Sequence, residues 1–337
     1  MQSGAIRIPF SQLEKDLARI LVKYGFDARR ADQCAHVFAS NTLDGVYSHG
    51  IERFPRFIRH VVDGYVKPDA EPSCKNRAGA IEQWDGCLGA GILNALISTE
   101  RAIELSAEFG LGCVALSNTN HWMRGGYYGW KVAKAGFIFI GWTNTVANMP
   151  AWGAVDCRLG NNPLVIGVPY GNEAIVLDMA MSQFSYGRME RHSRFGDPLP
   201  VPGGFDKQGS LTTDPAAILE SGRLLPMGYW KGSGLALLLD ILATLLSGGL
   251  STAKISRLEA EHAQSQVFFC IDISHLGNHQ QIQQAVHEII ENLKASTSHR
   301  TSDPVLYPGE NVLNARKEHL ASGIPVQESF WNEIQRL

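Results

Sequence analysis

The chain has 337 residues, 45% of them hydrophobic, with 34 glycines and 15 prolines, which is enough apolar material for a globular protein with more than one lobe. A net charge of −3 leaves no basic excess for nucleic acid or for an anionic membrane, so these partners are not expected.

The N-terminal region is predicted to be helical as far as Gly64. A capping box at residues 11–14 indicates the start of a first helix, which ends at Gly25, and a second helix is expected over residues 28–43. The first helix carries an apolar stripe along one face, made of Leu13, Leu17, Ile20 and Leu21.

The next segment is the first candidate for chemistry. Pro55 suits the first turn of a helix, which places the helix start near Phe54 or, alternatively, near Ser48. In the second case the Ser48 hydroxyl caps the helix, and His49 and Arg53 share one face because they are four residues apart. The guanidinium can then grip the carboxylate of a keto acid while the imidazole protonates the new alkoxide. The alternative is a capped, solvated helix start with no catalytic role.

A polar connection over residues 68–78 separates this region from a series of strands and helices. The expected elements alternate in type, at residues 80–84, 92–109, 114–116, 127–135 and 137–142. Residues 110–115 match a loose dinucleotide-binding fingerprint, but a helix precedes these glycines and a strand follows them, which is the reverse of the Rossmann order. We therefore expect an α/β fold that is not a Rossmann fold.

Polar residues follow two of these strands at the points where the strands end. His121 lies in the first polar cluster and is a candidate for orienting a substrate, and Asn144 follows the next strand. Strands at residues 163–168 and 174–179 are expected to pair, with Asp178 as a candidate ligand of cofactor hydroxyls. A satisfied loop histidine and a polar strand-end aspartate are the alternatives without a function.

Two stretches without clear periodicity, residues 152–162 and 183–222, are predicted to be loops, and the length of the second indicates a functional or mobile segment. A glycine-rich stretch then leads into an apolar helix at residues 235–246. Its Lys231, with two glycines and a capping serine, is a candidate site for a cofactor phosphate, and the alternative is a flexible, well-capped helix start. A strand, a helix, a turn and a closing helix are expected at residues 267–273, 280–293, 307–311 and 329–337.

Two other kinds of site are not predicted. His275 and His279 are four residues apart, but Gly277 lies between them and no third ligand is evident, so we expect no metal site. The chain also lacks the nucleophile-elbow sequence of serine hydrolases.

The cysteines and apolar runs bear on the compartment. The six cysteines are scattered without a Cys-x-x-Cys pair, and Cys113 and Cys270 lie in apolar runs, which favours buried free thiols in a reducing compartment. Their even number leaves a disulfide-bonded alternative open. Residues 1–10 contain no apolar core of signal-peptide length, and the longest apolar run is broken by Asp240 and too short for a bilayer. A cytoplasmic location is therefore expected.

Several long runs occur in a characteristic order: GVYSHG at residues 45–50 with RFPRF at 53–57, NHWMRGG at 120–126, FSYG at 184–187 and LPMGYWKGSG at 225–234. With these runs the chain resembles, over almost its whole length, the malate/L-lactate dehydrogenase family that lacks a Rossmann fold. The resemblance implies a mixed, largely antiparallel α/β cofactor domain with a helical N-terminal lobe. The lobe would comprise residues 1–75, joined by residues 313–337, and the cofactor- and substrate-binding region would comprise residues 76–312.

The resemblance also implies an NAD(P)H-dependent reductase of a 2-oxo acid, most closely a sugar-derived diketo acid, that acts as a homodimer. His49 would donate the proton, Arg53 and His121 would complete the catalytic set, and the side chains of Ser48 and Asn144 would contact the substrate. Malate, lactate, sulfolactate, ureidoglycolate or a cyclic imine are the alternative substrates, and a non-catalytic binding protein is the alternative class.

The expected cofactor is NADH or NADPH. The sequence does not rank one above the other, because the acidic ribose-binding residue that distinguishes them in Rossmann folds has no equivalent position here. The residues that the resemblance assigns to the cofactor lie in three stretches: Ala174, Ile175, Val176, Leu177, Asp178, Met179 and Ala180; Trp230 and Lys231; Gly309, Glu310 and Asn311.

Overall fold

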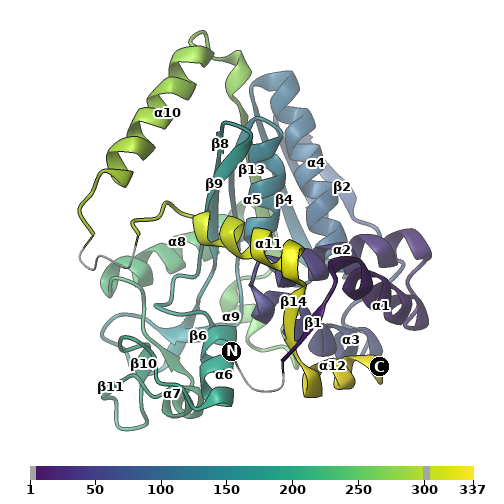
Figure 1. Ribbon diagram of the computed structural model, residues 1–337. Helices are drawn as coiled ribbons and strands as arrows, with labels where there is room; N and C mark the ends of the chain where they lie inside the picture. Colours follow the sequence, from purple (N-terminus) through teal and green to yellow (C-terminus); the bar gives the residue numbers. More distant parts are fainter. Residues whose placement is uncertain (1–4, 299–303) are drawn as a thin grey trace.

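In the computed structural model, which describes residues 5–298 and 304–337, a seven-stranded sheet runs through the middle of the molecule (Figure 1). Its strands in spatial order are β2 (Ser73–Ala78), β3 (Ile81–Asp85), β4 (Leu111–Thr119), β13 (Gln264–Asp272), β5 (Phe137–Thr143), β8 (Leu164–Tyr170) and β9 (Glu173–Met179). Only β3 and β4 are parallel neighbours, and every other pair is antiparallel. The predicted mixed, largely antiparallel fold is therefore confirmed, since a Rossmann sheet is parallel.

Helices cover both faces of this sheet. They are α4 (Gly91–Phe109), α5 (Gly125–Lys134) and α8 (Trp230–Ser247). Val114 and Leu116 of β4 face a core that they share with α4 and α5. Cys113 and Ala115 face a second core beneath α8. Because successive side chains of a strand point to opposite faces, a strand covered on both sides carries apolar residues at every position.

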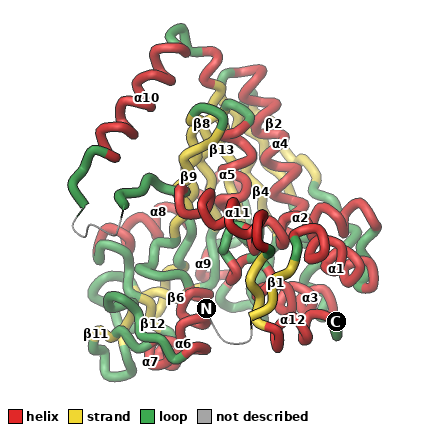
Figure 2. Tube along the Cα trace, in the orientation of Figure 1, coloured by secondary structure: helices red, strands yellow, loops and turns green. Residues whose placement is uncertain are grey.

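The two ends of the described chain meet on the flank of the molecule, beside the first helices (Figures 1 and 2). β1 (Ala5–Ile8) pairs with β14 (Ile324–Gln327) in an antiparallel ribbon. The helices gathered here are α1 (Phe10–Lys23), α2 (Ala28–Leu43), α3 (Phe54–Val62), α11 (Glu310–Ser322) and α12 (Glu328–Gln335). The predicted apolar stripe of α1 is confirmed, because all four of its residues are fully buried.

The remaining elements lie between the strands of the sheet in sequence, except α10, which follows the last of these strands, β13. They are β6 (Ala147–Pro150), β7 (Cys157–Gly160), α6 (Tyr186–Phe195), β10 (Gly204–Phe205), β11 (Leu211–Thr212), α7 (Pro215–Ser221), β12 (Arg223–Leu224), α9 (Thr252–Ile255) and α10 (His279–Lys294). Two predicted loops are therefore wrong, since β7 lies within residues 152–162, and α6 and α7 lie within 183–222. The signal was weak because Met189 is the one buried residue of α6, so this helix has no apolar stripe.

Helix starts account for most of the other differences. The capping box at residues 11–14 is wrong, because α1 begins at Phe10 and its N-cap residue is Pro9, which has an extended backbone and makes no side-chain hydrogen bond. Ser233 does not cap α8, since it lies inside the helix and its Oγ accepts a hydrogen bond of 3.0 Å from the backbone N–H of Trp152. Gly110 does end α4 in the left-handed conformation, with a φ of 80°.

The polar connection at residues 68–78 is only partly irregular, because it contains the edge strand β2. Four of the six residues of β2 are polar or charged, and three of these four are exposed, so its pattern lacks the apolar alternation of a strand. The Rossmann alternative at residues 110–115 is excluded by the structure, in which α4 precedes these glycines and β4 begins at Leu111.

Candidate active site

The segment that carries His49 is held against the end of α2. It forms two short 3₁₀ turns, Tyr47–His49 and Ile51–Arg53, on either side of Gly50, and α3 then begins at Phe54. The predicted start near Phe54 is therefore confirmed. Ser48 does not cap an α-helix, and His49 and Arg53 do not share a helix face, because Gly50 interrupts the backbone between them.

Gly50 makes this close approach to α2 possible. A Cβ atom at this position would lie 2.4 Å from Thr42 Oγ1 and 2.8 Å from the Thr42 backbone nitrogen, so any side chain would push the segment away. Thr42 Oγ1 accepts a hydrogen bond of 2.9 Å from the backbone N–H of Ile51. On the other side of the glycine, Asn41 Nδ2 donates a hydrogen bond of 3.0 Å to the carbonyl of His49. The polar end of α2 thus fixes the backbone on both sides of Gly50.

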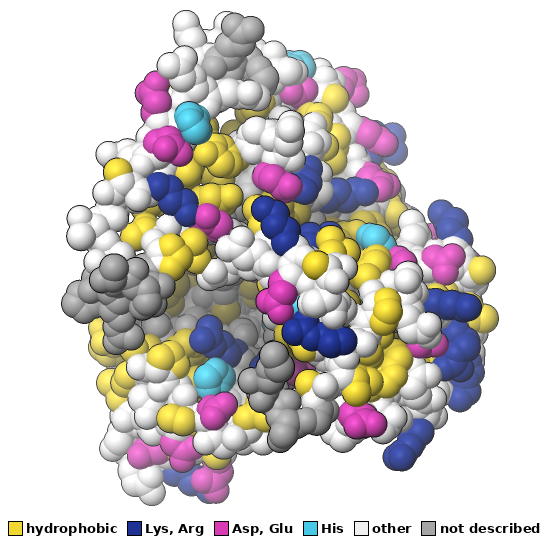
Figure 3. All heavy atoms as spheres, viewed as in Figure 1, with side chains coloured by type: hydrophobic (Ala, Val, Ile, Leu, Met, Phe, Trp, Pro, Cys, Tyr) yellow, Lys and Arg dark blue, Asp and Glu magenta, His cyan; other side chains and the backbone are white. Residues whose placement is uncertain are grey.

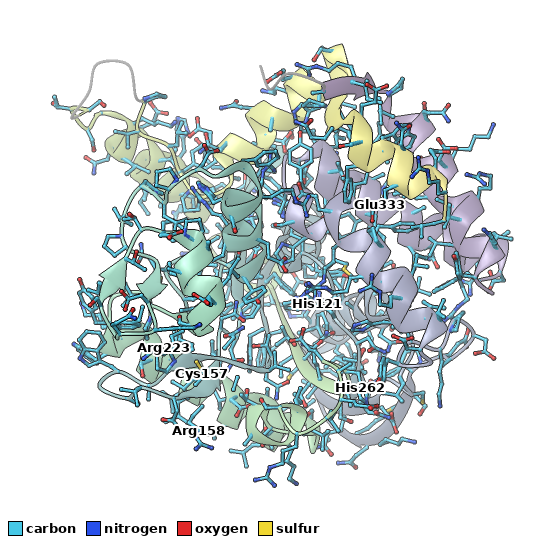
Figure 4. The ribbon with its side chains drawn as sticks, turned by 90° about the horizontal axis from the view of Figure 1, so that it is seen from below. His121, Cys157, Arg158, Arg223, His262 and Glu333 are labelled. Carbon is cyan, nitrogen blue, oxygen red and sulfur yellow. The ribbon has the colours of Figure 1, made fainter. Side chains whose placement is uncertain are left out.

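His49 and His121 lie side by side in one cavity. Their ring centroids are 5.8 Å apart and their planes are inclined by 29°. His121 comes from the loop after β4 and lies at the centre of the molecule between the N-terminal helices and the middle of the chain (Figure 4). The two rings line a cavity of about 470 Å³, into which the loop after β4 and the turn at residues 47–49 both project.

Hydrogen bonds orient both imidazoles. Ser48 Oγ lies 3.0 Å from His49 Nδ1. The backbone N–H of Met123 donates a hydrogen bond of 3.0 Å to His121 Nδ1, which leaves the proton of the neutral ring on Nε2. Met123 itself has a φ of 67°, a conformation that ordinary residues rarely adopt, so the backbone is strained at the residue that contacts His121.

The cavity favours the neutral form of both histidines. Burial, with smaller contributions from Arg53 and Arg124, lowers the pKa of His49 to about 3. Burial, Arg53 and His49 hold the pKa of His121 well below its usual value. A ligand that brings negative charge into this cavity would oppose these effects and favour protonation.

A buried ion pair between Arg124 and Asp44 organises the next wall of the cavity. Arg124 donates to Asp44 at a distance of 2.5 Å, and Asp44 also accepts from Arg316 of α11 at 2.7 Å. Asp178 lies 3.7 Å from Arg124 and accepts a hydrogen bond of 2.8 Å from the backbone N–H of Gly126, at the start of α5. Burial raises the pKa of Asp178, while Arg124 and the Gly126 N–H act in the opposite direction.

Two of the predicted substrate-binding residues do not line this cavity. Arg53 lies 3.6 Å from Glu261 and faces two smaller neighbouring cavities, although its charge acts on both His49 and His121. Asn144 is fully buried and its side chain is engaged on both sides, donating to Asp240 at 2.9 Å and accepting from the backbone N–H of Ser265 at 2.8 Å. The polar residues that do line the cavity near the end of β5 are Thr145 and Asn161.

The three predicted cofactor stretches lie next to one another along β9. The backbone N–H of Val176 donates a hydrogen bond of 3.1 Å to the carbonyl of Pro308, which places the turn before α11 beside the middle of β9. The end of β9 lies against the start of α8, since the backbone N–H of Met227 donates to the carbonyl of Met181 at 2.8 Å. Asp178 and Ala180 reach the cavity itself.

Sequence reasoning missed the contribution of α6. Arg188, Arg191 and His192 of this helix all line the cavity, and basic side chains with a histidine gather beside a hollow in this part of the surface (Figure 3). Two features of the sequence could have indicated this helix. The spacing of the three residues places them on one helix face. Ser185 is a helix N-cap, whose side chain accepts a hydrogen bond from the backbone N–H of Arg188.

Comparisons with known proteins identify the family and the fold of the chain. A sequence model of the family described as malate/L-lactate dehydrogenase matches residues 8–335. A curated relative, 2,3-diketo-L-gulonate reductase of Escherichia coli O6:K15:H31 (strain 536 / UPEC), is 44% identical over 333 residues, covering 98% of this chain and 100% of the relative.

Two solved structures extend the comparison. The malate dehydrogenase of Entamoeba histolytica superposes with a TM-score of 0.94 over 98% of this chain and 97% of its own, at 24% identity, which shows a shared fold. The Δ1-piperideine-2-carboxylate reductase of Pseudomonas syringae pvar. tomato superposes with a TM-score of 0.88 over 98% of this chain and 99% of its own, at 28% identity.

Proposed function

Because the chain belongs to the malate/L-lactate dehydrogenase family and is therefore an oxidoreductase, we propose that it reduces the keto group of a 2-oxo acid with NADH or NADPH. The substrate that we propose is 2,3-diketo-L-gulonate, which would yield 3-dehydro-L-gulonate. The observation that carries this proposal is the pair of buried, oriented imidazoles of His49 and His121 in one cavity. The full-length relative named for this activity supports the choice of substrate.

In this proposal His49 donates the proton to the oxygen of the keto group, and His121 positions that oxygen with its Nε2–H. A bound nicotinamide would supply the hydride. Ser48 keeps the His49 ring in place through its hydroxyl at Nδ1. His49 is neutral in the free protein because of burial, and the carboxylate of the substrate would favour its protonation when the substrate binds.

Arg53 would act on the substrate carboxylate from behind the two imidazoles. The positive charge of Arg53 helps to lower the pKa of both imidazoles. The distance of 3.6 Å between Arg53 and Glu261 is longer than a direct hydrogen bond. Asn144 would act indirectly, by fixing the end of β5 next to the cavity-lining Thr145 through its contacts with Asp240 and Ser265.

The chemistry of the three stretches along β9 fits a nicotinamide dinucleotide. Lys231 lies in the first turn of an 18-residue helix, where its charge and the positive end of the helix dipole favour phosphate. Gly309 has a φ of 93°, and a Cβ atom there would lie 2.9 Å from Trp130, so only glycine lets the turn before Glu310 and Asn311 approach β9 this closely. We propose that residues 174–180, 230–231 and 309–311 hold the cofactor.

We further propose a cytoplasmic homodimer in which α8 lies at the interface between subunits. By length and composition this helix would suffice to cross a membrane, but Ala236, Leu239 and Ala243 pack against the sheet, and Asp240 accepts hydrogen bonds from Asn144 and Thr252. The opposite face exposes large apolar side chains: Tyr229, Trp230, Leu237, Leu238, Ile241, Leu242 and Leu245. A second copy of the chain would remove this surface from water.

The division into lobes is also a proposal. The pairing of β1 with β14 and the hydrogen bond of 3.4 Å from Arg19 of α1 to Gln335 of α12 support joining the last helices to the N-terminal lobe of residues 1–75.

The test follows the loss of NADH or NADPH absorbance with 2,3-diketo-L-gulonate as substrate. The His49→Ala variant should lose about 100- to 10,000-fold in turnover, which is the usual contribution of a general acid, while cofactor binding measured by fluorescence stays intact. His36→Ala is the matched control, since His36 pairs with Glu14 outside the cavity and should not matter. Unchanged turnover in the His49 variant would remove His49 from its role.

A cyclic imine is the second candidate substrate, because the Pseudomonas syringae relative shares the fold and is named for a piperideine carboxylate. Binding of cofactor with reduction of the imine and no reduction of 2-oxo acids would favour this alternative. Absence of cofactor binding by titration would favour a non-catalytic protein.

A further inference from the structure

The helix α6 presents one basic face to the cavity. Arg191 and His192 follow Arg188 by three and four residues, and all three line the cavity, while Met189 is buried in the core beneath α8. The helix is closed at its end by Gly196, which has a φ of 68°.

This helix is docked tightly against the catalytic turn. Gly187 faces Ser48, and a Cβ atom on Gly187 would lie only 2.8 Å from Ser48 Cβ. The guanidinium of Arg191 lies 4.7 Å from the centre of the Tyr47 ring, which belongs to the same turn as His49. The packing of α6 therefore fixes the position of Arg191 relative to the reacting end of the cavity.

The hydrogen-bonding groups on this face lack protein partners. Within the described residues, Arg188 and Arg191 form no ion pair with a carboxylate, whereas Arg124 in the same cavity is held by Asp44. Stacking on Tyr47 engages the face of the Arg191 guanidinium and leaves its N–H edge available. His192 Nδ1 is buried and has no hydrogen-bond partner within the described residues, so it can accept or donate a hydrogen bond to a molecule in the cavity.

We propose that α6 recognises the end of the substrate that is farthest from the reacting keto group, with Arg191, assisted by Arg188 and His192, hydrogen-bonding to hydroxyl or carboxylate oxygens on carbons beyond it. This inference rests on the proposed reduction of a 2-oxo acid and adds a substrate class to it: acids with an oxygen-bearing tail. A guanidinium presents several donors in one plane and suits two neighbouring oxygens, whereas pyruvate offers only a methyl group there.

The test compares kcat/KM of the wild type, Arg191→Gln and Arg194→Gln on three acids: 2,3-diketo-L-gulonate with a hydroxylated tail, oxaloacetate with an anionic tail, and pyruvate. Arg194 is the matched control because it lies on the same helix, stacks over Phe330 at 5.7 Å and does not line the cavity. Arg191→Gln should lose about 10- to 100-fold in kcat/KM for at least one tail-bearing acid, mainly through KM, and less than about threefold for pyruvate. Arg194→Gln should change neither.

Loss confined to oxaloacetate would identify an anion as the recognised group, and loss with the sugar acid would identify hydroxyls. An equal loss on pyruvate, or no loss on either tail-bearing acid, would overturn the inference. Far-ultraviolet circular dichroism of each variant excludes a simple loss of folding.

A binding measurement separates this inference from the proposed reaction. The measurement is calorimetry with gluconate, which has no keto group to be reduced. Gluconate binding should be weakened at least about tenfold by Arg191→Gln and unchanged by Arg194→Gln. Arg191-dependent gluconate binding without reduction of any 2-oxo acid would refute the reaction and keep the role of α6. Two outcomes would refute the role of α6. In the first, the protein reduces 2-oxo acids but its binding of gluconate does not depend on Arg191. In the second, the wild type does not bind gluconate.

Discussion

Replacing Asp44 tests how much the buried ion pairs beside the cavity contribute to stability. These pairs join the end of α2 to the loop before α5 and to α11. The Asp44 side chain is 4% exposed and joins Arg124, which is 5% exposed, to Arg316 of α11. Asp44→Ala removes the nearer carboxylate from the buried Arg124 charge and leaves Asp178, 3.7 Å away, as its remaining acidic neighbour. The loss of one member of a buried pair destabilises by about 3–5 kcal/mol. We expect a loss of this size in the free energy of unfolding, measured by urea titration followed by tryptophan fluorescence.

The control breaks an ion pair of the same chemistry at the surface. Arg7 and Glu318 lie 3.3 Å apart and are 40% and 63% exposed, so Glu318→Gln should change stability by less than about 1 kcal/mol. In the double variant Asp44→Ala, Arg124→Met no unpaired charge remains at Arg124, and part of the loss should be recovered. A loss below about 1 kcal/mol for Asp44→Ala, with an unchanged slope against urea, would refute the reasoning.

The remaining predictions concern the reaction and the assembly. Burial lowers the pKa of His49 to about 3, so above this pH the protonated form that reduction requires becomes scarcer as pH rises. For reduction, kcat/KM should therefore increase about tenfold for each unit that the pH is lowered between about pH 8 and 6, and a plateau in that range would contradict the assignment of His49. Leu245→Glu puts a charge on the exposed apolar face of α8, where Leu245 is 69% exposed, and should shift the protein towards a monomer in sedimentation velocity. Wild-type protein that sediments as a monomer would refute the proposed dimer.

The proposed chemistry of the site could be predicted from the sequence because it depends on residue types in short, ordered runs. The runs that contain His49, His121 and Lys231 are local, and so is the order of helix and strand around Gly110 that excludes a Rossmann fold. Apolar periodicity likewise determined α1, α2, α4 and the paired strands β8 and β9, since burial on one face leaves a regular pattern.

Only the tertiary structure decided which side chains meet. Arg53 is four residues from His49 in sequence, but Gly50 breaks the backbone between two 3₁₀ turns and turns Arg53 towards Glu261. Arg191 is more than 140 residues from His49 along the chain, yet the packing of Gly187 on Ser48 brings α6 to the same cavity. Periodicity reports which face of an element is buried, whereas long-range contacts depend on how closely two backbones can approach, and here a single glycine at each contact sets that distance.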